Sequence, residues 1–196
     1  MNLSSAMSIY TLGDLLWADF WHRFPALRFS LSEGDIGWIP YFLQRGEHTL
    51  DRHNAWMGHR APQGLRPSEL FRERILCCFI SDRIGIKLLD ELNVDNVCWE
   101  SDYPHSDSMW PDAPEGLAEL MDGLDDEVVA KITHENAMRH YHFDPFTTRP
   151  REQATVGALR AEAADVDTVT RVGRRADETD IAAWRQMTGA AAKATR

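Results

Sequence analysis

In the segment Asp95-Asn-Val-Cys-Trp-Glu-Ser-Asp102, a short apolar run ends in a group of polar side chains, as expected of a strand that enters a polar loop. An earlier apolar run, Ile75-Leu-Cys-Cys-Phe-Ile80, has the length and composition of a strand that is buried on both faces. Between the two runs, Ile84, Leu88 and Leu92 recur at helical spacing. The order strand, helix, strand is typical of parallel strands joined by right-handed crossovers.

The same alternation continues outward from this pair of strands. Upstream, residues 27–31 alternate apolar and polar side chains, which predicts a strand, and residues 36–43 show helical spacing. Pro40 fits that helix only in its first turn, where the missing N–H is not needed. Downstream, helices are predicted around residues 116–124 and 127–141. The expected fold class is therefore α/β.

Three parallel strands make a small sheet for a complete domain. Such a sheet has two open edges, whereas a complete eightfold barrel typically needs about 250 residues, and this chain has 196. Residues 1–146, with about three βα units, are therefore predicted to be part of something larger. Residues 147–196 are rich in alanine and charged side chains, and they are predicted to form an extension that is partly helical or disordered.

The composition disfavours several kinds of partner. The chain has 21 Lys and Arg against 31 Asp and Glu, and a formal charge of -10 argues against a duplex-binding surface. No stretch approaches the roughly 20 consecutive apolar residues that span a bilayer, and the N-terminus lacks the features of a secretory signal. We therefore expect a cytoplasmic protein that binds neither nucleic acid nor membranes. Cys77, Cys78 and Cys98 lack C-x-x-C spacing and are expected to be core residues.

Acidic side chains follow each predicted strand. In α/β folds the reactive groups lie at the carboxyl ends of the strands, so the first candidates are Glu33, Asp82 and Asp102. Asp102 opens a loop, up to Pro111, in which carboxylates, an imidazole, hydroxyls and indoles are crowded. A carboxylate held there can bind a divalent metal, or it can take a proton from a metal-bound water whose pKa has fallen to about 7.

The segment WESDYPHSDSMWP, residues 99–111, resembles the last-strand motif of the amidohydrolase superfamily. More narrowly, it is similar to the amidohydrolase-related branch that includes aminocarboxymuconate-semialdehyde decarboxylase. FPALRFSLSEGDIGWIPYFLQR, residues 24–45, is similar to the sixth strand and following helix of that branch. ITHENAMRHYHF, residues 132–143, resembles its closing helix, with Asn136, Ala137 and Arg139 in the characteristic places. Together the matches cover roughly residues 18–146.

The resemblance implies the C-terminal part of a metal-dependent (β/α)8 enzyme that acts on a small-molecule substrate. Such enzymes hydrolyse a C–N or C–O bond, or remove a carboxylate from an unsaturated ring-derived acid. Asp102 occupies the place of the aspartate that contacts the metal, usually zinc, and handles the proton of the nucleophilic water. Glu33 stands at the sixth-strand position, where the decarboxylases often carry histidine, and is a candidate oxygen ligand and catalytic group. His105 is expected to contact substrate or to orient Asp102.

The sequence also departs from the family pattern. The H-x-H pair of the first strand and the histidine of the fifth strand are not found, and the one H-x-H here is His140-Tyr-His142. It falls at the end of a predicted helix, where the two histidines are expected to be cations favoured by the helix dipole. We therefore expect the chain alone to be catalytically weak or inactive, and the metal to be zinc if one is bound, although a carboxylate suits manganese or magnesium as well.

The partial barrel also admits two interpretations that do not involve catalysis by this chain. The chain is either a non-catalytic half-barrel that pairs with itself or with a separately encoded N-terminal half, or the product of a truncated reading frame. Glu100 raises a further question, because strict alternation would place it on the same strand face as Cys98 and Asp102. Either it is paired, for example with an arginine, or the strand ends before it. Trp17 and Trp21, at i and i+4, are expected to pack on one helix face.

Overall fold

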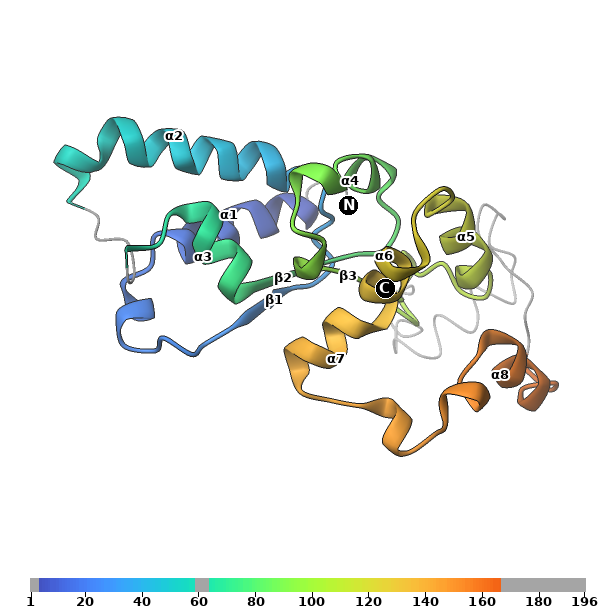
Figure 1. Cartoon of the computed structure of the whole chain (residues 1–196). Coiled ribbons are helices and arrows are strands. Elements are labelled where there is room, and N and C mark those ends of the chain that lie inside the picture. Colours follow the sequence, from blue (N-terminus) through green and yellow to red (C-terminus); the bar gives the residue numbers. More distant parts are fainter. Residues whose placement is uncertain (1–3, 59–63, 167–196) are drawn as a thin grey trace, which may run out of the picture. The chain divides into compact units, whose positions relative to one another are not determined.

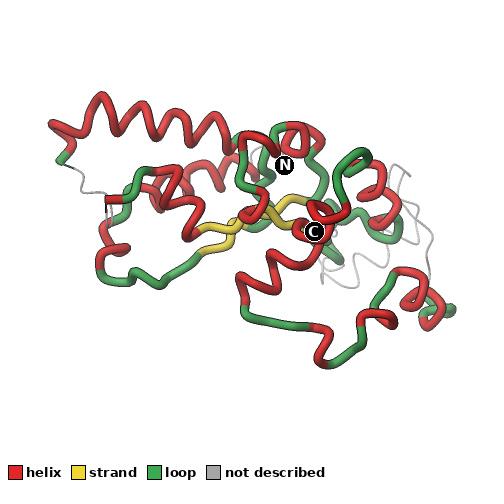
Figure 2. The backbone as a smooth tube through the Cα atoms, in the orientation of Figure 1, coloured by secondary structure: helices red, strands yellow, loops and turns green. Residues whose placement is uncertain are grey.

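The computed structural model of the chain describes residues 4–58 and 64–166, in which three short parallel strands alternate with helices (Figure 1). The strands are β1 (Phe29–Leu31), β2 (Ile75–Phe79) and β3 (Val97–Trp99), in the spatial order β1-β2-β3. Figure 2 shows the strands side by side, with helices making up most of the remaining described chain. The predicted α/β class is confirmed. The last 30 residues of the predicted extension, 167–196, lie outside the described residues.

The helices predicted after the three strands are present as α2, α4 and α5 to α7, whereas α1 and α3 are not part of the predicted strand–helix series. The helix bounds are α1 Ser4–Leu16, α2 Ile39–Met57, α3 Pro67–Arg74, α4 Arg83–Lys87, α5 Ala113–Leu120, α6 Asp126–Ala130, α7 Asn136–Tyr141 and α8 Val156–Glu162. A π-helical turn, Lys131–Glu135, joins α6 to α7. Short 3-10 turns are Asp19–His22, Leu89–Glu91, Val94–Asn96, Pro145–Thr147 and Arg151–Gln153.

The register of the sheet brings the carboxyl ends of all three strands to one edge. Phe29 pairs with Ile75, and Cys78 pairs with Cys98, both in parallel orientation. Every residue of β2 is buried, which explains why its sequence is a continuous apolar run rather than an alternating one. On their outer sides, β1 and β3 have no neighbouring strand in the part of the chain that is described. The sheet is therefore small and open.

The two faces of the sheet are buried by different groups. Leu31, Ile75, Phe79 and Val97 join the main hydrophobic core, together with side chains of α1, α2 and α3. Cys78 and Cys98 lie on the opposite face in a smaller cluster with Leu76 and Ala137. All three cysteines are free and buried, as predicted, and burial raises the pKa of the Cys77 thiol. They act as small apolar residues that let helices approach the sheet closely.

Two predicted helical features differ in the structure. Pro40 does lie in the first turn of α2, but α2 continues past the predicted end and stops at Gly58, whose φ of 66° suits glycine. Trp17 and Trp21 do not share a helix face, because α1 ends at Leu16 and Trp21 lies in a 3-10 turn. The Trp21 indole is 1% exposed and donates to the carbonyl of Leu15 at 2.6 Å. The indole therefore caps the end of α1 and packs in the core, and this contact replaces the expected helical pairing.

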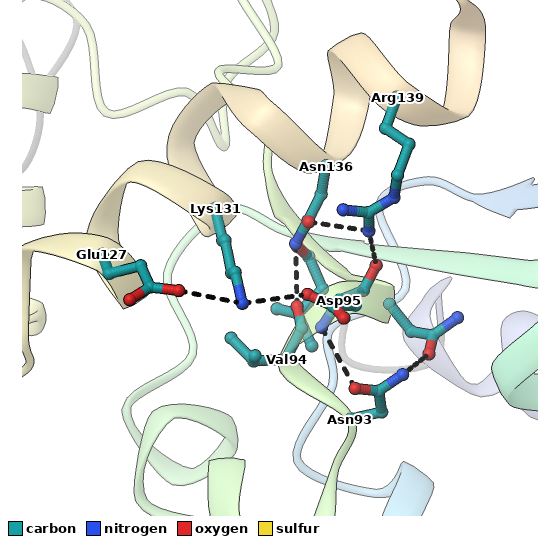
Figure 3. A network of polar contacts seen from close by, with 9 residues as sticks. Asn93, Val94, Asp95, Glu127, Lys131, Asn136 and Arg139 are labelled. Atoms are coloured by element: carbon teal, nitrogen blue, oxygen red, sulfur yellow. Dashed lines mark hydrogen bonds and ion pairs between the residues drawn. The ribbon is translucent and has the colours of Figure 1, made fainter.

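The buried side-chain amide of Asn136 connects the amino end of β3 to the closing helix (Figure 3). The Asn136 side chain, fully buried at the start of α7, donates to the carbonyls of Val94 and Val97 at 2.8 Å each. Arg139 donates to the carbonyl of Asp95 at 2.7 Å and to the Asn136 side-chain oxygen at 2.9 Å. These contacts fix where β3 begins. They also show that Asn136 and Arg139 of the closing-helix motif are structural in this chain.

Candidate metal centre

Glu33, Asp102 and His105 come together at the carboxyl edge of the sheet. One ligand atom from each lies within 4.8 Å of the other two. Glu33 follows β1 and Asp102 follows β3, so the two carboxylates come from strands that flank β2. The predicted candidates after the first and third strands are thus neighbours in space, as the common direction of parallel strands requires.

Asp82, the candidate after β2, lies elsewhere, and its carboxylate accepts hydrogen bonds from backbone amides. Its Oδ2 accepts the backbone N–H groups of Ile36 at 2.8 Å and Gly37 at 2.7 Å. Its Oδ1 accepts the N–H of Gly85 at 2.8 Å and so caps α4. Both carboxylate oxygens are therefore engaged by backbone amides. Asp82 ties the loop after β1 to the start of α4 and is not part of the candidate metal centre.

The Asp102 carboxylate is nearly buried and is paired with an exposed imidazole. Its side chain is 7% exposed, that of His105 is 69% exposed, and Nδ1 of His105 lies 2.6 Å from Oδ1 of Asp102. Hydrogen bonding and the negative charge of Asp102 raise the pKa of His105. A turn also joins the two residues, because the His105 N–H donates to the Asp102 carbonyl at 2.8 Å. The pair can therefore share a proton between two defined atoms.

The backbone at both candidate carboxylates is in the left-handed region. The φ angle is 56° at Glu33 and 50° at Asp102. Residues other than glycine adopt this conformation rarely, and each instance costs about 1–3 kcal/mol unless the surroundings hold it. Such positions cluster at functional sites. Here the conformation turns both acidic residues just after their strands end.

Glu100 supplies one of the contacts that hold Glu33. β3 ends at Trp99, so the second of the two alternatives for Glu100 is correct, and its N–H donates to the Phe79 carbonyl at 3.0 Å. Its carboxylate accepts the backbone N–H of Glu33. The partner is thus a backbone amide and not an arginine. Since β2 lies between β1 and β3, this contact connects the ends of the two outer strands.

The electrostatics of this edge suit a cation. Burial raises the pKa of Glu100, and the negative charges of Glu33 and Asp102 raise it further. Three carboxylates therefore repel one another at the same place, with one imidazole among them. Carboxylate oxygens and an imidazole nitrogen are ligands of zinc and of manganese. A divalent cation fits this donor set because it would relieve the repulsion.

Glu100 leads to a pH-dependent prediction for stability. A raised pKa means that the fold favours the protonated carboxyl, so this contribution to stability is present below the ordinary glutamate range and is lost as the pH rises through the pKa of the folded state. Glu100→Gln keeps an acceptor for the Glu33 N–H and removes the charge. We expect it to match the wild type near pH 4 and to be more stable near pH 7. Glu100→Ala, which also loses the acceptor, should be less stable than Glu100→Gln by about 1 kcal/mol at both values.

Urea denaturation at the two pH values measures these differences. Glu119→Gln, an exposed change on α5, is the control for removal of a surface charge. If Glu100→Gln showed the same stability difference from the wild type at both pH values, the assigned cause of the raised pKa would be wrong.

An aromatic pair lies in the loop that follows Asp102. The rings of Tyr103 and Trp110 meet edge to face, with centroids 5.4 Å apart. Tyr103 is 62% exposed and Trp110 is 45% exposed. Large exposed rings offer apolar surface to a planar partner.

Comparison with known proteins identifies the family. The sequence profile of the family described as Amidohydrolase matches residues 10–143, which is more than half of the chain. The chain therefore belongs to the amidohydrolase family, whose members are generally metal-dependent. This confirms the superfamily resemblance of the last-strand motif. No curated protein matches the chain.

Solved structures show the same fold over part of their length. One is a 5-carboxyvanillate decarboxylase from Sphingomonas paucimobilis, with a TM-score of 0.55 and 22% identity, covering 66% of this chain and 38% of that one. Another is an amidohydrolase from Mycobacterium avium subsp. paratuberculosis K-10, with a TM-score of 0.54 and 18% identity, covering 66% and 32%. The chain thus spans less than half the length of these structures. The predicted fold, about three βα units from a (β/α)8 barrel, is confirmed.

Two further predictions can be compared with the structure. None of the helices in the described segments is both long and apolar enough to cross a membrane. His140 and His142 lie at the end of α7 and are not among the residues of the candidate metal centre. The boundary between residues 1–146 and 147–196 as separate domains stays a prediction.

Proposed function

We propose that the chain carries part of a divalent-metal centre of an amidohydrolase-type enzyme, with Asp102 and Glu33 as metal-binding or catalytic groups and His105 beside the substrate. The observation that carries this proposal is the convergence of the three ligand atoms within 4.8 Å at the carboxyl edge of the sheet. The left-handed backbone at Glu33 and Asp102 and the repulsion acting on Glu100 support it.

Zinc is the proposed metal because the family resemblance implies it, and carboxylate oxygens such as those of Asp102 and Glu33 can bind it. When bound, zinc would supply a water of pKa about 7 and would polarise a substrate oxygen. The residues of this chain hold and move the proton: Oδ1 of Asp102 accepts it and Nδ1 of His105 shares it across 2.6 Å. The exposed rings of Tyr103 and Trp110 lie in the loop between Asp102 and α5, and we assign them contact with a planar part of the substrate.

Two reaction types share this arrangement. One is removal of a carboxylate from an unsaturated acid, which the aromatic pair favours, and a decarboxylase is among the structures with the same fold. The other is hydrolysis of a C–N or C–O bond, in which a metal-bound water would attack and the Asp102–His105 pair would take its proton. Because the chain spans only 38% of the length of the decarboxylase, we propose that its activity alone is weak or absent.

The open sheet favours a second candidate function, that of a half-barrel without catalysis of its own. The outer sides of β1 and β3 carry no neighbouring strand within the described residues. Unpaired strand edges are templates for pairing with another chain. A second copy, or a separately encoded half with complementary strands, would cover them.

Zinc binding tests the first candidate directly. We expect the wild-type chain to bind about one zinc ion after equilibrium dialysis, measured by atomic absorption. Asp102→Asn should weaken binding by about 100-fold, because a neutral amide replaces a charged ligand. Asp107→Asn, a change of the same type at an exposed position in the same loop, is the control and should bind as the wild type does.

A wild-type chain without bound zinc, or an Asp102→Asn chain that binds it equally well, would refute the proposed metal centre. Assays of ester, amide and aromatic-acid turnover on the same samples report the activity. Sedimentation of the wild type at micromolar concentration separates the two candidates, since a clean monomer counts against the half-barrel.

A further inference from the structure

A cavity lies at the opposite edge of the sheet from the candidate metal centre. Its volume is about 600 Å³, and it is bordered by the amino ends of β2 and β3 and by α7. We call it the basic hollow because its lining includes Arg28, Arg72, Arg74, Arg139, His140 and His142. The acidic side chains in the lining are Glu73 and Asp95.

The acidic side chains of the basic hollow are already engaged. Asp95 forms an ion pair with Lys131 at 3.4 Å, and Glu73 forms one with Arg74 at the same distance. By contrast, Arg28 and Arg72 form no ion pair within the described part of the chain. Positive charge is therefore left in excess around this cavity, although the whole chain has a formal charge of -10.

Arg139 contributes a guanidinium group that is held in place. Its Nη2 donates to the Asp95 carbonyl and to the Asn136 side chain, and Figure 3 shows the guanidinium lying over these two acceptors. One nitrogen of the planar group makes both contacts. A guanidinium anchored in this way is preorganised, so less side-chain freedom is lost when a ligand binds.

The pKa of His140 reflects the charges around it. Burial lowers its pKa, and the nearby positive charges of Arg28, His142 and Arg139 lower it further. His140 lies in the last turn of α7, where burial and the neighbouring cations oppose the charged form that the helix dipole is expected to favour. This side of the cavity therefore carries an excess of positive charge, with Glu73 and Asp95 as the acidic side chains of the lining.

We propose that the basic hollow binds a small phosphate-bearing anion. Guanidinium groups match phosphate oxygens in bidentate geometry, and several of them around one cavity suit a ligand with more than one negative charge. The volume falls within the range of small-molecule sites, about 300–1,000 Å³. A bound polyanion would neutralise the arginines that lack an acidic partner. The site is separate from the metal centre, because it lies at the amino ends of the strands.

Calorimetric titration of the full chain with pyrophosphate tests this inference, with EDTA present so that metal does not contribute. We expect binding that weakens as sodium chloride rises from about 50 to 300 mM. Arg28→Gln and Arg72→Gln should each weaken it by about tenfold, and the double variant should abolish it. Arg83→Gln, an exposed arginine at the start of α4, is the matched control and should leave binding unchanged.

A second readout is specific for the location. Pyrophosphate should raise the pKa of His140, followed by the NMR shifts of its ring protons, because a nearby anion favours the protonated ring. Citrate is titrated in parallel as a polyanion that carries carboxylates in place of phosphates. Binding of citrate but not of pyrophosphate would overturn the phosphate assignment. No binding, or equal binding by the Arg28→Gln and Arg72→Gln double variant, would overturn the site. Asp102→Asn should bind pyrophosphate as the wild type does, so this test is independent of the proposed metal centre.

Discussion

Asp82→Ala is expected to lower the free energy of unfolding by about 3 kcal/mol, since three backbone N–H groups lose their acceptor. Those of Ile36 and Gly37 belong to the loop before α2, and that of Gly85 belongs to the first turn of α4. A protein donor or acceptor left unpaired costs about 1–3 kcal/mol when buried, and less where water reaches it. Asp82 is half-buried, so we take the lower part of that range for each amide.

The sequence around Asp82 leaves little room for another arrangement. A Cβ added at Gly85 would lie 2.2 Å from the Ile36 side chain and 2.7 Å from Asp82 Oδ2. Glycine is therefore required for the two loops to meet at this carboxylate.

Urea denaturation followed by circular dichroism measures the effect of Asp82→Ala. Asp122→Ala, an exposed aspartate after α5, is the control and should change stability by less than about 0.5 kcal/mol. Asp82→Asn should fall between the two, because the amide keeps one acceptor oxygen. Equal stability of Asp82→Ala and the wild type would show that the three amides find water or other acceptors.

Asn136→Leu is the second change with a large expected effect, also about 3 kcal/mol. The leucine has a similar size but donates no hydrogen bond, so the carbonyl of Val97 loses its side-chain donor and that of Val94 keeps only the N–H of Val97, next to a fully buried side chain. Arg139 also loses its contact with the side-chain oxygen of residue 136. The loss comes from unsatisfied polar groups and not from a cavity.

Thermal unfolding measures this loss, and a drop of about 10 °C is expected for a chain of this size. Asn54→Leu, the same change at a more accessible position on α2, serves as the control and should unfold near the wild-type temperature. An Asn136→Leu chain that unfolds at the wild-type temperature would contradict the assigned role of the buried amide.

The sequence predicts the parts of this fold that depend on local pattern. The apolar run of β2 and the helical spacing after it identify a βα unit, and the parallel direction of the strands then places Glu33 and Asp102 at one edge. The strands are shorter than predicted, with β1 at residues 29–31 and β3 at 97–99. Alternation continues beyond the hydrogen-bonded ladder, so pattern alone overestimates strand length.

Contacts between distant segments are beyond such reasoning. The contact from Glu100 to the Glu33 amide joins residues 67 positions apart and spans β2, and no local signal indicates it. Asp82 is a reasonable candidate from its place after a strand, but its role depends on amides 45 and 46 positions away. The sequence signal for the buried network is the closing-helix motif, which includes Asn136 and Arg139.

The hydrogen bonds from Asn136 to the amino end of β3 have a consequence for synthesis on the ribosome. Residues 97–99 leave the ribosome well before residue 136, because chains emerge from the N-terminus. Until the closing helix has been translated, Val94 and Val97 lack the amide that binds them. A nascent chain therefore carries its last strand loosely held, and the aspartate beyond that strand reaches its final position only after translation has passed the closing helix.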